Sequence, residues 1–446
     1  MIEVKEEQNQ YLAQFEHLEK SLSQEPQSWL MPVRKAAIAR FAEMGFPTIR
    51  DEEWRYTNVA PIANTTFEAP SGANREVTPE GIAEFAFADA AALLVFVNGR
   101  YAAQLSRVQS LPKGVRIESL AAALQSDTAL LGRHLARHAD VHEQAFTALN
   151  TALTEDGAFV HVPAGVILEQ PLHVLHVMRV ENGPIAVHPR NLIVLGDSSQ
   201  ATIVETFAGM GDEKYFTNAV TEVVAGDNAV VDHYKIERES EAAFHVATLQ
   251  LHTNRNSNLS SHTVSLGGAL VRHDINAILD GEGGECVING LYMLRGAQHV
   301  DNHLRVEHAK PHCNSREFFK GIMDGQSKGI FSGRIKVHKA AQKTDAKQTN
   351  MSLLLSEDAQ VESKPQLEIF ADDVKCTHGA TIGQVNQDAI FYLRSRGMSE
   401  QAARSLLVFT FANESLDRIR VESLRAQLAN LVFDRLPQGQ SLRGAL

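Results

Sequence analysis

The stretch "NLIVLGDSSQATIVETF", residues 191–207, is typical of the middle of this chain. Two short runs rich in Val, Ile, Leu and Thr flank the cluster "GDSS", which is the pattern of two strands joined by a turn. Similar runs fill residues 146–385 with almost no helical interruption, which disfavours alternating strand–helix units. Turn clusters that begin at Gly196, Gly226 and Asn256 are 30 residues apart. This spacing lies in the range of solenoid repeats.

Two all-β architectures fit this pattern, a stacked sandwich and a parallel β-helix. A β-helix tolerates connections of irregular length, because each turn needs only its neighbours. A sandwich of this length would normally divide into two domains. We therefore predict a mainly β protein with a parallel β-helix core over residues 146–385.

Residues 1–145 are expected to form a helical and loop region. Hydrophobic residues recur at helical spacing from Leu12 to Leu22, and the helix predicted for "VRKAAIARFAEMG" would end at Gly45. Strand signals are expected to begin only at Gly157.

Residues 386–446 are expected to form a C-terminal helical domain. The run "QDAIFYLRSRG" has basic residues in its last turn and ends at Gly397, as helices often do. Ser399 would cap the next helix, and a third helix would carry a hydrophobic stripe from Leu416 to Val432.

Composition excludes several classes of protein. The formal net charge of −12 over 446 residues disfavours non-specific binding to nucleic acid or to anionic membranes. We find neither a signal peptide nor an apolar run long enough to span a membrane. The three cysteines, Cys286, Cys313 and Cys376, are too few and too widely spaced for a disulfide framework. A cytoplasmic location is therefore expected.

The chain lacks the motifs of several enzyme classes. It has no GxxxxGK[ST] sequence, so it is not expected to bind or hydrolyse a nucleotide. One enzymatic alternative is a β-helical carbohydrate-active enzyme, which needs paired acids in a groove. Asp345, Asp372 and Asp373 are candidates, but neighbouring residues of a strand point to opposite faces, so Asp372 and Asp373 cannot form such a pair. We expect the chain not to be an enzyme.

The stretch "VKCTHGATIG", residues 374–383, places Cys376 and His378 two residues apart in a predicted strand. Residues i and i+2 of a strand share one face, so a thiol and an imidazole would lie side by side. This pairing suits iron and sulfur species. The alternative is that both are ordinary residues of a packed sheet.

A second group of possible ligands is a run of four histidines, His299, His303, His308 and His312, followed by Cys313. The spacing matches no established metal motif. Polar side chains on the outer face of a solenoid explain the run better than a metal site does.

At the level of whole motifs, the chain resembles the SufB/SufD family of iron–sulfur cluster assembly proteins. The resemblance rests on residues 331–399, which include "AQKTDAKQTNMSLLLS", and on "HCNSREFFKGI", "VPAGV" and "EEWRYTN". It covers nearly the whole chain. The "CTHGAT" segment and the low cysteine count resemble the SufD-type branch more than the SufB-type branch.

This resemblance implies a right-handed parallel β-helix and three protein interactions. A SufB-type scaffold would bind through β-helix edges, a SufC-type ABC ATPase would bind the C-terminal helices, and the isolated chain would form a homodimer. His378, with Cys376 beside it, would contact iron or a transient iron–sulfur cluster at the scaffold interface. ATP-driven movement transmitted through residues 399–436 would expose the two side chains. The alternatives within the family are a SufB-like scaffold acting alone and a purely structural subunit.

Overall fold

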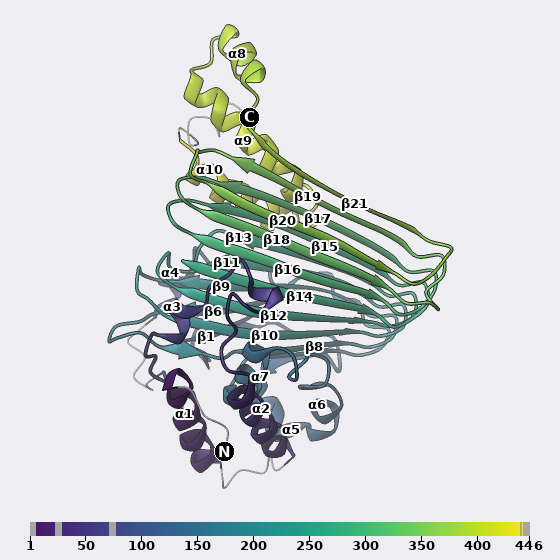
Figure 1. Ribbon diagram of the computed structural model, residues 1–446. Coiled ribbons are helices and arrows are strands. Elements are labelled where there is room, and N and C mark those ends of the chain that lie inside the picture. The colour runs from purple at the N-terminus through teal and green to yellow at the C-terminus, as the bar shows by residue number, and fades with distance from the viewer. Residues whose placement is uncertain (1–5, 23–28, 71–76, 438, 440–446) are drawn as a thin grey trace.

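The computed structural model describes residues 6–22, 29–70, 77–437 and 439. Its main body is a parallel β-solenoid of about 8 turns, with helices at both ends (Figure 1). The predicted fold class, a mainly β solenoid between an N-terminal and a C-terminal helical region, is confirmed. Within the described ranges, no helix is long and apolar enough to cross a bilayer.

Two sheets form the walls of the solenoid, and we name each after its C-terminal edge strand. The β21 sheet contains β1 (Ala92–Val97), β2 (Arg100–Tyr101), β3 (Arg107–Val108), β6 (Leu172–Met178), β9 (Gln200–Gly209), β11 (Val230–Arg238), β13 (Asn258–Ser265), β15 (Glu285–Leu294), β17 (Asn314–Met323), β19 (Asp345–Leu354) and β21 (Lys375–Gln384). The β20 sheet contains β4 (Arg116–Ser119), β5 (Ala158–Val162), β7 (Ala186–Val187), β8 (Arg190–Leu195), β10 (Phe216–Ala225), β12 (Phe244–Thr253), β14 (Leu270–Leu279), β16 (His299–His308), β18 (Lys328–Val337) and β20 (Gln360–Ile369).

The repeat expected from the turn clusters is present in the strand register. Val230 pairs with Gln200, 30 residues earlier, and later steps along the β21 sheet range from 27 residues (Asn258 to Glu285) to 31 residues (Asn314 to Asp345). In the turns, Asn228 and Asn256 adopt positive φ angles of 57° and 52°. Asparagine tolerates this left-handed conformation better than most residues, so the chain can turn sharply at each repeat.

Parallel pairing in register stacks equivalent side chains into columns that run along the solenoid. One column faces the interior and consists of His233, Ser261, Ile288, Glu317, Gln348 and His378. We call it the His378 column. Its inward direction follows from Ile288, which packs in the main hydrophobic core between the two sheets.

The N-terminal helices cover the first turns of the solenoid (Figure 1). They are α1 (Glu6–Leu22), α2 (Leu30–Met44), the 3-10 helix η1 (Glu52–Trp54), α3 (Ala60–Ala63), α4 (Pro79–Ile82), α5 (Leu120–Ser126), α6 (Thr128–His134) and α7 (Ala145–Leu153). Aromatic and aliphatic residues of α1, α2 and α7 pack with Phe216 and Phe244 of the β20 sheet. As expected, Gly45 ends α2, with a φ of 70°.

One expectation for this region is wrong. Strands do not begin at Gly157, because β1 already pairs in parallel with β6. All six residues of β1 are buried, so its sequence "ALLVFV" shows no alternation of apolar and polar positions.

The C-terminal helices are α8 (Gln387–Ser395), α9 (Glu400–Leu416) and α10 (Glu422–Arg435). The predicted cap is confirmed, because the Ser399 side chain accepts a hydrogen bond from the backbone N–H of Ala402. Helices α9 and α10 pack on the outer face of the β21 sheet, where Leu416 and Leu428 join Tyr234 and Leu291 in a second core. Helix α8 projects beyond the last strands (Figure 1).

Candidate functional site

The candidate site lies on β21, the last strand of its sheet. Strand β21 pairs in parallel with β19 and ends the strand order on that side. In the other sheet, β20 pairs with β18 and is likewise an edge. The residues of β21 from Thr377 to Gln384 are all exposed, and Ile382 keeps 52% of its surface accessible. Both walls of the solenoid therefore end in edge strands.

The structure places Cys376 and His378 on the same face of β21, as the sequence predicted. Cys376 is half-buried and packs against the main core. Burial raises the pKa of its thiol, although a hydrogen bond from the Ala346 backbone acts in the opposite direction. A metal ion would have to displace the thiol proton, because the thiolate is the ligand form.

His378 differs from Cys376 in being exposed. Across the described ranges, no hydrogen bond to its ring is formed. A neutral imidazole and a thiolate are both known ligands of iron–sulfur clusters. The described residues hold no group of three or more His, Cys, Asp or Glu side chains arranged to bind a metal ion. Cys376 and His378 can thus supply at most part of a coordination sphere.

Beneath His378, the same column continues with two buried polar side chains. Gln348 and Glu317 are 1% and 2% exposed, and Gln348 Nε2 donates a hydrogen bond to Glu317 Oε2. Burial raises the pKa of Glu317 to about 8, so this carboxyl is largely uncharged at neutral pH. Our sequence analysis missed both residues. The signal was available in the 30-residue spacing between Gln348 and His378.

The four histidines that precede Cys313 do not form a site. His299 and His303 lie on the outer face of β16, beside Thr57 (2.9 Å) and Glu53 (3.2 Å) of the N-terminal loop. His308 points inward to Ser315, with 2.9 Å between Nε2 and Oγ. His312 lies exposed in a turn.

The other two cysteines are also unsuited to bind iron. Cys286 is fully buried in the core, and burial raises the pKa of its thiol. Cys313 is buried as well, and its thiol donates to the carbonyl oxygen of Gly281 at 3.2 Å.

The acids considered for carbohydrate chemistry take part in separate contacts. Asp345 pairs with Arg316 at 3.1 Å, and Asp373 pairs with Lys343. Asp372 and Asp373 lie in the turn before β21 rather than in a strand.

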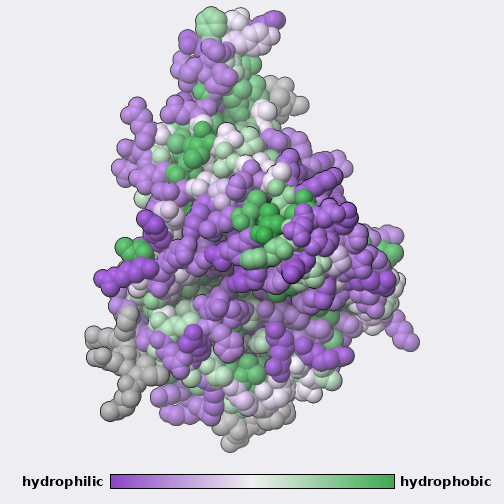
Figure 2. Space-filling view, turned by 45° about the vertical axis from the view of Figure 1, so that its right-hand side comes forward, coloured by the Kyte–Doolittle hydropathy of each residue, from purple (hydrophilic) through white to green (hydrophobic). Residues whose placement is uncertain are grey.

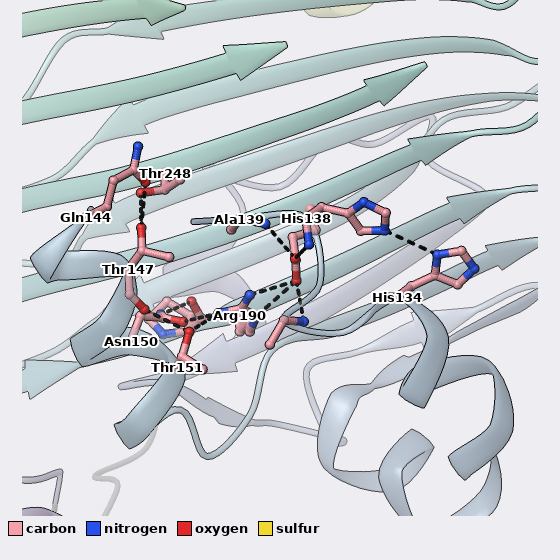
Figure 3. A network of polar contacts seen from close by, with 12 residues as sticks. His134, His138, Ala139, Gln144, Thr147, Asn150, Thr151, Arg190 and Thr248 are labelled. Atoms are coloured by element: carbon pink, nitrogen blue, oxygen red, sulfur yellow. Dashed lines mark hydrogen bonds and ion pairs between the residues drawn. The ribbon is translucent and has the colours of Figure 1, made fainter. Parts of the chain in front are cut away.

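A further polar cluster, drawn in Figure 3, fixes the N-terminal region to the solenoid. Arg190 of β8 forms a buried ion pair with Glu222 of β10 at 2.8 Å. Glu222 also accepts backbone hydrogen bonds from Ala136, His138 and Ala139 (Figure 3). These contacts fill the acceptor positions of the carboxylate, so the cluster has a structural role.

Comparison with known proteins identifies relatives over almost the whole chain. Residues 176–411 match the family described as "SUF system FeS cluster assembly, SufBD core domain", and residues 5–174 match "SufBD protein N-terminal region". An iron–sulfur cluster assembly SufBD family protein of Synechocystis is 34% identical over 92% of this chain and 91% of its own length. The iron–sulfur cluster assembly protein SufD of Escherichia coli is 32% identical over 92% of this chain and 93% of its own. SufD of Bacillus subtilis is 27% identical, over 92% and 94%.

Proposed function

The chain belongs to the SufBD family of iron–sulfur cluster assembly proteins, and we propose that it is the SufD-type subunit of a complex with a SufB-type scaffold and a SufC-type ABC ATPase. A role in iron–sulfur cluster assembly follows from the family. The finer proposal is that the chain helps to acquire iron and to form the nascent cluster at its interface with the scaffold. The cluster is cargo that passes through the site.

The observation that carries this proposal is the pair of unpaired edges, β20 and β21, at the same end of the solenoid as His378. An exposed strand edge offers a row of backbone N–H and C=O groups to another strand. A partner strand beside β21 would bring its own side chains next to Cys376 and His378. The missing ligands would then come from the scaffold.

The same edges support a proposal about the isolated chain. Without its partner, an exposed edge is free to pair with a second copy. We therefore expect a homodimer that dissociates when the scaffold is supplied.

The C-terminal helices are the proposed site for the ATPase. Helix α8 buries Ile390, whereas Phe391 and Tyr392 are 75% and 57% exposed. Figure 2 shows hydrophobic side chains among hydrophilic ones on the projection at the top, where α8 lies. Exposed aromatic side chains are typical of protein interfaces. In this proposal the chain has no catalytic activity of its own, and nucleotide hydrolysis belongs to the ATPase subunit.

Movement of the ATPase would reach the site through the packing of the C-terminal helices on the solenoid. The shared core links α9 and α10 to the β21 sheet at Leu291 of β15 and Leu353 of β19. Strand β19 is the neighbour of β21. A shift of these helices would therefore act on the strand that positions Cys376 and His378.

The test is the iron and acid-labile sulfide content of the three-subunit complex, produced anaerobically with wild-type chain or with His378→Ala. We expect the variant to form an intact complex with less than about a third of the wild-type cluster. Thr377→Ala is the matched control, because Thr377 is exposed on the same strand but points to the opposite face. A Phe391→Asp complex should lose the ATPase and keep the scaffold.

The competing functions give different results in the same experiment. Normal cluster content in an intact His378→Ala complex would make the chain a purely structural subunit. Cluster assembly on this chain without the SufB-type partner would make it a scaffold that acts alone.

A further inference from the structure

We propose that Gln348 is the positioning residue for His378: its side-chain carbonyl oxygen accepts the ring N–H of His378 from inside the solenoid. The second ring nitrogen then faces the interface with its lone pair free for iron. This inference rests on the proposed function, because it takes His378 to be the iron-binding group.

The first step of the argument is the register of the strands. Glu317, Gln348 and His378 are direct partners on β17, β19 and β21. Neighbouring strands lie about 4.8 Å apart, and in-register side chains on one face stack along the column. The side chain of Gln348 therefore lies directly beneath that of His378.

The second step is the orientation of the Gln348 amide. Its Nε2 donates to Glu317 Oε2, on the side away from His378. Its Oε1 is buried and has no hydrogen-bond partner within the described ranges. A buried carbonyl oxygen without a partner is unfavourable, so almost all such atoms in folded proteins find a donor. The ring of His378, on the next strand, carries the nearest unused donor of the column.

The third step is the shape of the facing sheet. Gly333 of β18 lies opposite Gln348, and a Cβ built on Gly333 would overlap the amide nitrogen of Gln348. The absence of a side chain at this position makes room for the amide. Gln348 is thus held between Glu317 on its own sheet and the backbone of the other sheet.

The chemistry of metal-binding histidines gives this arrangement its role. A histidine that binds a metal through one ring nitrogen usually donates the N–H of the other to a carbonyl or carboxylate group. That hydrogen bond fixes both the tautomer and the direction of the ring. An amide does this without placing a negative charge next to the imidazole.

The experiment combines two measurements on the full-length chain. The first is the ¹⁵N spectrum of the chain labelled at histidine, in which His378 is assigned by the signal lost in His378→Ala. The second is the cluster content of the three-subunit complex. Gln348→Met keeps the size of the side chain but removes the acceptor, and Gln348→Glu keeps an acceptor oxygen.

The matched control is Asn350→Leu. Asn350 lies on the same strand and face, is also 1% exposed and donates to Ser363 at 2.9 Å. Its partner on β21 is Ala380 rather than a histidine. Loss of a buried amide at this position therefore measures the purely structural effect.

We expect a single tautomer of His378 in the wild-type chain and a mixture in Gln348→Met. Cluster content should fall about tenfold in Gln348→Met, as is typical when the outer partner of a metal ligand is removed. Gln348→Glu should restore most of it, and Asn350→Leu should stay close to wild type.

Two results would overturn the inference. The first is a wild-type His378 with the tautomer mixture of free histidine, which can be measured even if Gln348→Met fails to fold. The second is equal loss of cluster in Gln348→Met and Asn350→Leu. If His378→Ala itself keeps its cluster, the proposed function fails, whereas the tautomer spectrum still decides whether Gln348 orients the ring.

Discussion

His233 and His378 occupy the same inward column of the β21 sheet, yet they lie in opposite surroundings. His233, in the covered middle of the solenoid, is fully buried. Both of its ring nitrogens are engaged, one with Glu205 at 2.7 Å and the other with Ser261 at 3.0 Å. His378, on the last strand, is exposed, and no described residue bonds to its ring. The difference lies in whether another strand covers the column.

This comparison shows how a repeating fold produces a site. In the middle of the solenoid, each polar side chain has a strand on either side and can satisfy its hydrogen bonds within the chain. At the end of the column, one of these neighbours is missing. A side chain of the same type then becomes available to a ligand or to a partner protein.

The largest expected effect is on the covered histidine. His233→Ala would leave the Glu205 carboxylate buried without its main partner, and breaking a buried pair in this way costs about 3–5 kcal/mol. His378→Ala removes an exposed side chain and should change the free energy of unfolding by less than about 0.5 kcal/mol. Denaturant unfolding of the two variants and the wild type measures the difference. Equal loss of stability in both variants would contradict the contrast between the covered and open ends.

Most of the fold could be predicted from sequence because each turn of a solenoid repeats the same local pattern. Short β-rich runs and turn clusters such as those at Gly196 and Gly226 reflect the return of the chain to the same sheet after about 30 residues. Strand β1 escaped prediction for a physical reason. Buried on both faces, it has no polar positions to reveal its period, and helical patterns surround it.

The candidate site could be predicted only in part. The alternation of side chains along one strand was enough to place Cys376 and His378 on one face. The position of Gln348 beneath His378 depends on the register between strands 30 residues apart. The histidines from His299 to His312 show the opposite failure, because neighbours in sequence lie on the outer face, in the interior and in a turn.

A smaller effect is expected from the two buried carboxyls of the comparison, Glu205 and Glu317. Burial acts to raise the pKa of both. In the covered middle, the hydrogen bond and charge of His233 nevertheless lower the pKa of Glu205 to about 2. Near the open end, Glu317 has only the amide of Gln348 as a partner, and its pKa rises to about 8.

The raised pKa of Glu317 gives a stability effect with a definite sign. Between pH 4.5 and 8 the folded chain keeps a proton on Glu317 that the unfolded chain releases. The contribution of this group is therefore fully present below pH 4.5 and is lost as the pH rises towards 8. Each unit of pKa shift corresponds to about 1.4 kcal/mol.

Glu317→Gln removes this titration and keeps an acceptor for Gln348. We expect its free energy of unfolding, relative to wild type, to increase by at least about 1 kcal/mol between pH 5 and pH 8. Urea unfolding at both pH values measures the change. The same difference at pH 5 and pH 8 would show that Glu317 is already ionised in the folded chain.

The smallest effect on the isolated chain is expected at Gly379, the residue that follows His378. A Cβ built on Gly379 meets no atom within 4 Å, whereas one built on Gly290, in the covered part of the same sheet, overlaps the ring of Phe319. Gly379→Ala should therefore leave the free energy of unfolding within about 0.5 kcal/mol of wild type, and overpacking in Gly290→Ala should cost about 1–3 kcal/mol. If a partner strand covers β21 in the complex, the methyl group of Gly379→Ala will meet that strand, and its affinity for the SufB-type protein will fall while its stability does not. Unchanged affinity in a variant of normal stability would mean that this part of β21 stays uncovered in the complex.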